Sequence, residues 1–327
     1  MNKPSEIVQR WRRMQRHAGH MLGCDRSFLR NAKGARILVY HGICRTDPLR
    51  YNTLFITQRK FEEQLRYFRK YFNIISLDQF YRGEFSSDRF SICLTFDDGF
   101  ANNFTNALPL LEKYKVPATF FVTGAREAGY DILWNDVLSM AAKHGPSDFS
   151  FLDDYFIRGR EKKYWSVSAG RSLQDILREK DFRPKAELLS LLGDFRLEAD
   201  QEYWLLLEDV QLRALAQSKW ATVGAHGYYH DDLARIEQVG LKKDLRRSKQ
   251  YLERVTEKEI TALAFPYGSY SPAVIAEARE AGYTRFLATD LMHPSDEEVE
   301  GLRERLTINP FISSLNQSYA SITGNYN

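Results

Sequence analysis

Eight short apolar runs recur along this chain, and the segments between them carry apolar residues at helical spacing. Several of the runs are apolar without alternation, which is typical of strands that are covered on both faces. Alternation of such strands with helices predicts an α/β fold with a parallel sheet, and the number of runs favours a barrel. The runs are ARILVYHGI (35–43), FNIISL (72–77), SICLTFDDG (91–99), PATFFVTG (117–124), WATVGAHGY (220–228), ALAFPYGS (262–269), TRFLATD (284–290) and RLTINPF (305–311).

The segments between the runs have the periodicity and the end signals of amphipathic helices. Apolar residues recur at helical spacing in 58–71 and again in 241–252. The stretch 271–282 begins with Ser271 as N-cap and Pro272 at the first helical position. These patterns predict that each of these three segments forms a helix between two strands.

One long segment, at about 131–214, breaks the rhythm. It is rich in charged and aromatic residues and contains no run of the buried-strand type. We interpret it as a helical insertion that interrupts a single domain spanning 35–312. The predicted organisation is completed by a basic N-terminal arm, 1–34, and a C-terminal tail, 313–327.

Composition and charge exclude several classes of protein. Hydrophobic residues make up 43% of the 327 positions, which is too many for a disordered chain. No apolar run approaches the ~18 residues that a membrane span needs. Residues 1–36 hold nine Lys or Arg against two acids, whereas the rest of the chain has more acids than bases. We therefore expect no nucleic-acid partner for the body of the protein.

The N-terminal arm and the cysteines bear on location. The arm lacks the apolar region of a secretory signal, and the three cysteines Cys24, Cys44 and Cys93 form no closely spaced pair, which favours a reducing compartment. The predicted location is the cytoplasm. The arm is interpreted either as a solvated helix packed on the domain or as an amphipathic helix in peripheral contact with the inner face of a membrane.

Two adjacent carboxylates, Asp97 and Asp98, end the run 91–99 in the sequence TFDDG. Side chains alternate between the faces of a strand, so both carboxylates can face one site only where the strand ends and the backbone turns. Gly99 supplies the freedom for that turn. An ordinary surface turn is the alternative interpretation. The position favours function, because ligands of parallel α/β sheets bind at the carboxyl ends of strands.

Two histidines, His226 and His230, follow the run at 220–228 in the sequence HGYYH. Imidazoles four residues apart can meet one ion in a helical or tightly turned segment. Two neutral imidazoles and one carboxylate suit Zn²⁺ or a similar divalent metal and leave positions open for water and substrate. Structural histidines are the alternative. The turn FPYG at 265–268 adds a candidate backbone donor for an oxyanion.

In this order and spacing, TFDDG, ATFFVTG, G-x-H-G-x-x-H and FPYG resemble the motifs of the NodB-homology polysaccharide deacetylases, carbohydrate esterase family four. The resemblance covers roughly 35–130 and 215–312. It implies a distorted (β/α) barrel of the NodB type and a divalent metal, Zn²⁺ first and Co²⁺, Ni²⁺ or Mn²⁺ as alternatives, which serves to remove N- or O-acetyl groups from sugars. The implied roles are Asp97 as general base, Asp98, His226 and His230 as metal ligands, and the Tyr267 backbone N–H as oxyanion donor.

The sequence departs from the family pattern in three places. Gly227 stands where a Ser or Thr is usual, and Ala264 where an arginine usually orients the base. The late Leu-x-His motif is matched in letters only, by His293. The expected general acid is instead His41, in LVYHGI, as in the bacterial exopolysaccharide deacetylases whose catalytic elements are circularly rearranged. His293 or a water stays open as the acid.

These observations predict a metal-dependent hydrolase that removes acetyl groups, N-acetyl first, from a polysaccharide or glycan precursor in exopolysaccharide biosynthesis. Two alternatives remain. The first is a deformylase or other N-acyl hydrolase acting on a lipid-linked or nucleotide sugar, which the basic arm favours. The second is a catalytically inactive glycan-binding protein on the same fold, for which Ala264 and the open identity of the general acid are the motivation.

Overall fold

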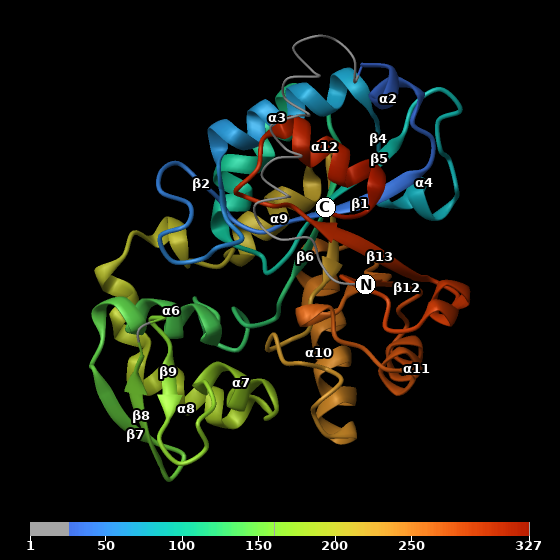
Figure 1. The fold of residues 1–327 in the computed structure, drawn as a ribbon. Coiled ribbons are helices and arrows are strands. Elements are labelled where there is room, and N and C mark those ends of the chain that lie inside the picture. Colours follow the sequence, from blue (N-terminus) through green and yellow to red (C-terminus); the bar gives the residue numbers. More distant parts are fainter. Residues whose placement is uncertain (1–25, 160, 327) are drawn as a thin grey trace.

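Seven parallel strands close into a barrel (Figure 1). The structure is a computed structural model that describes residues 26–159 and 161–326. The ring runs β1-β13-β12-β11-β10-β6-β5 and closes because β5 pairs with β1 in parallel. All eight predicted strands form, so the predicted α/β barrel is confirmed. The strands of this sheet are β1 (Ala35–Tyr40), β4 (Asn73–Ile75), β5 (Ser91–Phe96), β6 (Ala118–Val122), β10 (Ala221–Ala225), β11 (Ala262–Ala264), β12 (Arg285–Ala288) and β13 (Leu302–Thr307).

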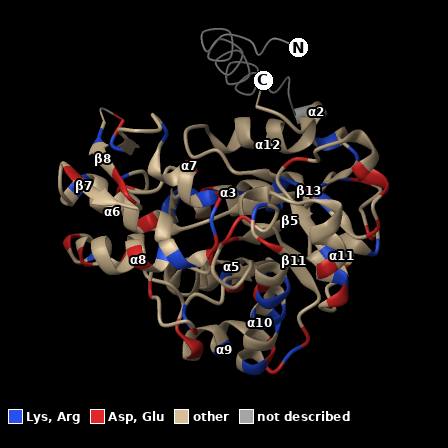
Figure 2. Ribbon diagram, turned by 90° about the horizontal axis from the view of Figure 1, so that it is seen from below, with Lys and Arg blue, Asp and Glu red and all other residues tan. Residues whose placement is uncertain are grey.

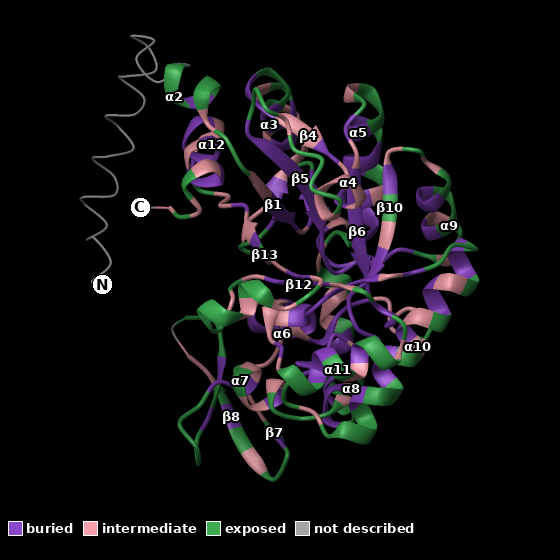
Figure 3. Cartoon of the chain, turned by 90° about the vertical axis from the view of Figure 1, so that its right-hand side faces the viewer, coloured by how far each residue is buried: buried purple, intermediate pink, exposed green. Residues whose placement is uncertain are grey.

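The eighth strand, β4, lies outside the ring. It pairs with the first half of β5, while β6 pairs with the second half. All residues of β5 and β6 are buried, as Figure 3 shows for the inner strands. This double coverage explains why their sequences are apolar without alternation.

Helices surround the barrel. Helix α3 begins after Thr57, whose hydroxyl accepts a hydrogen bond from the Lys60 N–H, and it buries Phe61 and Phe68 against the sheet. Helix α11 begins after Ser271 with Pro272 as its first residue, as predicted. The helices of the barrel are α2 (Arg26–Asn31), α3 (Gln58–Tyr71), α4 (Leu77–Tyr81), α5 (Leu108–Tyr114), α9 (Asp209–Gln217), α10 (Gln238–Thr256), α11 (Pro272–Glu280) and α12 (Ser314–Thr323).

The structure describes nearly all of the predicted C-terminal tail but only a small part of the predicted N-terminal arm. The tail, 313–327, contains α12, which contacts α3 and β1 and so belongs to the barrel wall. Most of the arm, 1–34, lies outside the described residues; in its described part, Leu29 of α2 is fully buried. Within the described residues, no helix is both long and apolar enough to cross a bilayer.

The insertion forms a lobe beside the barrel (Figure 1) and is not purely helical. Besides helices it contains a three-stranded antiparallel sheet, β7-β8-β9. The β7–β8 turn consists of Leu152 and Asp153, both with positive φ. Such turns are usually signalled by Asn-Gly or Asp-Gly, which is why the sequence pattern missed the hairpin. The elements of the lobe are α6 (Trp134–His144), β7 (Asp148–Phe151), β8 (Asp154–Arg158), β9 (Tyr164–Ser166), α7 (Leu173–Arg178), α8 (Phe182–Leu192) and the 3₁₀ turns η2 (Gly193–Glu198) and η3 (Gln201–Tyr203).

The insertion leaves and rejoins the barrel at neighbouring points. The Leu206 N–H donates to the Asp131 carbonyl over 2.9 Å, and α9 packs in the barrel core rather than in the lobe. The insertion therefore ends near residue 207, slightly earlier than predicted.

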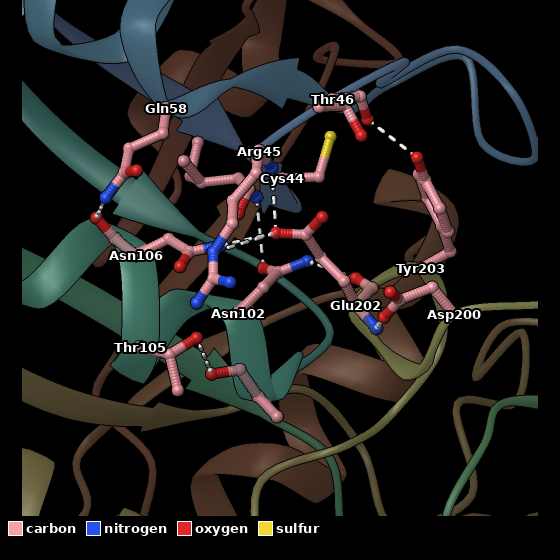
Figure 4. Close-up of polar contacts among 12 residues, drawn as sticks. Cys44, Arg45, Thr46, Gln58, Asn102, Thr105, Asn106, Asp200, Glu202 and Tyr203 are labelled. Atoms are coloured by element: carbon pink, nitrogen blue, oxygen red, sulfur yellow. Dashed lines mark hydrogen bonds and ion pairs between the residues drawn. The ribbon is translucent and has the colours of Figure 1, made fainter.

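A polar network secures this junction (Figure 4). The Glu202 carboxylate accepts hydrogen bonds from the Arg45 N–H, over 2.7 Å, and from the Asn106 amide, over 2.9 Å. The Tyr203 hydroxyl donates to the Thr46 carbonyl over 2.7 Å. These bonds tie the returning end of the insertion to the loop that follows the short strand β2 (Ile43–Cys44), which pairs with β3 (Ile56–Thr57).

Candidate active site

The ends of two barrel strands bring the three predicted metal ligands together. Asp98 follows β5, while His226 and His230 follow β10. The Nε2 atoms of His226 and His230 lie 3.4 and 3.2 Å from Asp98 Oδ1. One candidate ligand atom from each residue lies within 4.8 Å of the others, and all three side chains are buried. Two imidazole nitrogens and one carboxylate oxygen at this spacing form a donor set that fits a zinc-like divalent metal.

The backbone bends sharply at these residues. Asp98 has φ of 74° and His230 has φ of 57°, left-handed values that side-chain-bearing residues seldom adopt. Such strain concentrates at functional sites. Gly227 also has positive φ, at 72°, and a Cβ there would lie 3.3 Å from Asp244 Oδ1. The departure from Ser or Thr at this position therefore suits the local backbone.

Neighbouring groups orient the two histidines. His226 Nδ1 lies 2.8 Å from the Ala264 carbonyl oxygen; donation from Nδ1–H to that oxygen leaves Nε2 facing Asp98. Asp244, on α10, accepts hydrogen bonds from the N–H groups of Tyr228 and Tyr229, over 2.8 and 3.2 Å. The loop between the histidines is therefore held from outside the site.

Arg305 holds the second carboxylate of the pair, and sequence reasoning missed it. Its Nη1 and Nη2 donate to Asp97 Oδ1 and Oδ2 over 2.7 and 2.8 Å, and both side chains are buried. Burial alone would raise the pKa of Asp97, but Arg305 and then His226 outweigh it, and the pKa is lowered. Asp97 is therefore ionised, as a general base must be.

Arg305 reaches Asp97 along the inside of the barrel. It lies on β13, level with Ile37 of β1, which in turn is level with Cys93 of β5. The Arg305 guanidinium also donates a hydrogen bond, through Nη1, to Thr95 Oγ1 of β5 over 3.4 Å. The base-orienting arginine that is missing at Ala264 is thus replaced from a different strand. The one available signal was a lone cation at the start of an apolar run.

His41 and His293, the two candidate acids, lie in different surroundings. His41 follows β1 and lines the same cleft as Asp97 and Asp98. The Asn103 side chain donates to its carbonyl over 2.8 Å, and its Nδ1 is buried without a partner. Burial lowers the pKa of His41, against the raising influence of Asp98 and Asp97. His293 is exposed, precedes the 3₁₀ turn η5 (Pro294–Glu298) and does not line the cleft.

A cleft of about 640 Å³ lies between the barrel mouth and the insertion. Tyr267, in the turn η4 (Pro266–Gly268), lines its barrel side, with φ of 59° and its ring 4.8 Å from that of His230. Asn135 and Asp136, from α6, line the opposite side. Asn135 Oδ1 and Asp136 Oδ2 are buried without hydrogen-bond partners. Burial, and then Asp98, raises the pKa of Asp136 well above its usual value.

The model of the polysaccharide deacetylase family matches residues 86–149 and 195–286 of the sequence. The chain belongs to the polysaccharide deacetylase family. The two matched segments include the Asp97–Asp98 pair, both histidines and Tyr267, and they leave out the middle of the insertion. A search of curated proteins finds no match.

Solved structures of deacetylases share the fold. The chain is similar to the Streptococcus pyogenes deacetylase PplD in complex with acetate, with 19% identity, a TM-score of 0.58, and coverage of 88% of this chain and 97% of that one. It is also similar to IcaB from Ammonifex degensii, with 17% identity, a TM-score of 0.54, and coverage of 89% of this chain and 98% of that one. A third similar structure is that of the de-N-acetylase from Aggregatibacter actinomycetemcomitans, with 16% identity, a TM-score of 0.50, and coverage of 86% of this chain and 95% of that one. The barrel is therefore of the NodB type found in polysaccharide deacetylases.

Within this deacetylase fold, the structure gathers the site residues that the sequence singled out, except the alternative acid His293. Asp97, Asp98, His41 and Tyr267 line one cleft with both histidines. Arg305, Asn135 and Asp136 were not predicted. No local motif marks the latter two, because they lie in the insertion and face the site only through the fold.

Proposed function

We propose that this deacetylase-family chain hydrolyses acetyl groups, N-acetyl first, on a glycan or glycan precursor, with a divalent metal held by Asp98, His226 and His230. The observation that carries the proposal is the compact buried set of those three donors beside the ionised Asp97. A bound divalent metal would polarise an acyl carbonyl and lower the pKa of a water. The description of a structural neighbour as a de-N-acetylase supports N-acetyl as the first choice.

The chain's own residues supply the proton transfers. Asp97 Oδ2 lies 3.9 Å from His226 Nε2, beside the donor set, and Arg305 keeps it ionised, so it is placed to accept a proton from a water. His41 is the proposed acid, because its Nδ1 is free of protein partners and it lines the cleft. The Tyr267 N–H is proposed as the oxyanion donor. Asn135 and Asp136 would hydrogen-bond polar groups of the sugar from the other side.

The inactive glycan-binding alternative is weakened by Arg305. One of its two motivations was the absence of an arginine at Ala264, and the Arg305–Asp97 pair supplies the same orientation; the other was the open identity of the general acid. A protein without turnover has no evident need for a buried bidentate pair beside a donor set.

The test is acetate release from a panel of N-acetylated oligosaccharides by the purified protein. A chelator should abolish release, and Zn²⁺, Co²⁺, Ni²⁺ or Mn²⁺ should restore it. Asp98→Asn should lose both metal content and activity, whereas Asp88→Asn, at an exposed carboxylate, should keep both. Undiminished release after metal removal, verified by metal analysis, would overturn the metal assignment. A fully metallated protein that binds glycans without releasing acetate or another acyl group would favour the inactive alternative.

A further inference from the structure

The end of the cleft away from the metal-ligand set is strongly basic. The residues concerned come from three segments: the loop after β2, the end of α6 and the β8–β9 turn. We call this group the cationic rim; it consists of Arg50, Lys143, Lys162 and Lys163, which line the cleft, and of Arg158 and His144, which line an adjoining hollow of about 510 Å³ together with Arg50, Lys143 and Lys162.

Acids offset the positive charge of the rim only in part: Glu161 is the one acid among the described residues that lines the cleft at the rim, and Asp47 acts on Lys143 from nearby. Among the described residues, no ion pair involves any of the four cleft-lining cations, although acids and bases are mixed over the outer helices (Figure 2). The Lys143 ammonium donates to the Arg50 carbonyl, and the Arg158 guanidinium donates to the Ala142 and Gly145 carbonyls over 3.3 and 3.2 Å. These acceptors are neutral, so the charge persists. Burial first, and then the like charges of Lys162 and Arg50, lower the pKa of Lys143, against the raising influence of Asp47.

The part of the rim that contains Arg50, Lys143 and His144 is held in place before any ligand binds. Lys143 Nζ and Arg50 Cζ lie 4.3 and 5.5 Å from the centroid of the Tyr51 ring, within the range of cation–π attraction. The Tyr51 hydroxyl lies 2.8 Å from His144 Nε2. The network of Figure 4 fixes the start of the same loop to the insertion. A preorganised group of cations loses little entropy on binding an anion.

Helix capping accounts for only part of the rim. Basic groups at the end of α6 interact favourably with its free carbonyls and its dipole, which explains Arg158 and His144. It does not explain Arg50 and Lys162, whose positive charges repel Lys143, or Lys163, which also lies outside that helix. Cations kept together despite repulsion are expected where they bind an anion.

We propose that the cationic rim binds a phosphoryl group of the acylated sugar, so that the substrate is a sugar phosphate ester or diphosphate. Donors from three segments can surround a tetrahedral, multiply charged group, as Arg and Lys do at phosphate sites. The same cleft joins the rim to the metal-ligand set, which places the phosphoryl group and the acyl group at opposite ends of one substrate. The inference rests on the proposed function for the acyl end. Nucleotide sugars and lipid-linked glycans both carry a phosphoryl group on the sugar and could both supply such a substrate.

Binding is tested first, with inorganic pyrophosphate as the probe in calorimetry at low salt. The combined variant Lys143→Gln with Lys162→Asn should bind at least about tenfold more weakly than the wild type, because charge-assisted hydrogen bonds are lost. Asparagine suits position 162, where φ is 54°. The matched control is Lys258→Gln, because that exposed lysine also donates to a carbonyl, of Ala216, away from the cleft. It should bind as the wild type does. Equal pyrophosphate affinity in the wild type and the rim variant would overturn the inference.

Turnover then distinguishes the sources. kcat/KM is measured for a neutral N-acetylated oligosaccharide, a nucleoside-diphosphate N-acetyl sugar and a polyprenyl-diphosphate N-acetyl sugar in detergent. The preference of the wild type for a phosphorylated substrate should fall about tenfold in the rim variant. Whichever of the two phosphorylated substrates the wild type prefers shows whether the natural substrate is a nucleotide sugar or a lipid-linked sugar. Equal loss on the neutral substrate would contradict the inference. If no substrate reacts while pyrophosphate still binds through the rim, the deacetylase proposal fails and the phosphoryl site stands.

Discussion

The barrel and the insertion contribute differently to the same cleft. Every residue of β5 is buried, and the ends of the barrel strands carry the donor set and the Arg305–Asp97 pair. In β8 of the insertion only Phe156 is buried, between two exposed residues, and the lobe supplies Asn135, Asp136 and most of the cationic rim. The comparison suggests that the barrel encodes the reaction and the insertion selects the substrate. A change in the barrel should therefore abolish turnover, whereas a change in the insertion should alter stability or preference.

The largest effect is expected from Asp97→Asn. Loss of the proposed base should lower kcat by about 10²- to 10⁴-fold, while metal content stays at the wild-type level because the donor set is intact. Acetate release and metal analysis of the same preparation check both parts. Full activity of this variant on a genuine substrate would show that the base has been misassigned.

The next effect concerns the contact between the two regions. Lys185 of the insertion lies 2.5 Å from Asp231, next to His230, and both side chains are buried. Lys185→Met leaves a buried carboxylate unpaired and should lower the free energy of unfolding by about 3–5 kcal/mol at pH 8. Burial raises the pKa of Asp231 to about 6, although Lys185 opposes it, so the carboxyl can become neutral at pH 5 and the loss should be smaller there.

Chemical denaturation at the two pH values measures this difference. Lys180→Met, at an exposed lysine of the same segment, is the control and should change little. Adding Asp231→Asn to Lys185→Met should recover part of the lost stability. An equal loss for the Lys185 and Lys180 variants would mean that the buried pair does not join the two regions energetically.

A smaller effect is expected from Arg305→Gln. Without the guanidinium the pKa of Asp97 should rise, so the acidic limb of the pH profile of kcat/KM should move to higher pH, with a loss of about tenfold or more near neutrality. Arg305→Lys should restore part of the activity, because it keeps the charge but not the bidentate geometry. Arg303→Gln, on the same strand, is the control. An unmoved acidic limb in Arg305→Gln would reduce Arg305 to a structural role.

The last effect is a pH dependence of stability set by Asp244, with no effect expected on the reaction itself. Burial, and then Asp231, raises its pKa to about 7, against the two backbone hydrogen bonds that it accepts. The folded state therefore holds a proton that the unfolded state releases near pH 4. Its stabilising contribution is present below that pH and is lost as the pH rises toward 7.

Asp244→Asn removes this titration. Its stability relative to the wild type should improve between pH 4 and 7 by about 3–4 kcal/mol. Unfolding midpoints of both proteins across that range provide the measurement, and parallel curves would contradict the assignment.

Whether a feature could be predicted from the sequence depended on whether a local sequence pattern marks it. A strand covered on both faces leaves a local apolar pattern, so all eight strands and the groups at their ends, such as Asp98 and His226, could be read in advance. The hairpin at Leu152 and Asp153 could not, because its turn lacks the usual residues. Asn135 and Asp136 lie in an amphipathic helix whose pattern does not say which wall it forms.

The sequence alone determined the alternation of strands and helices, the strand ends and the paired carboxylates and imidazoles found there, since each depends on residues close together in the chain. Only the tertiary structure decided that β13 would lie beside β1 and bring Arg305 to Asp97, 208 positions away. It also decided that the insertion would face the barrel mouth with its cations. Such contacts depend on strand order, register and barrel closure, which the packing of the whole chain sets and no local pattern encodes.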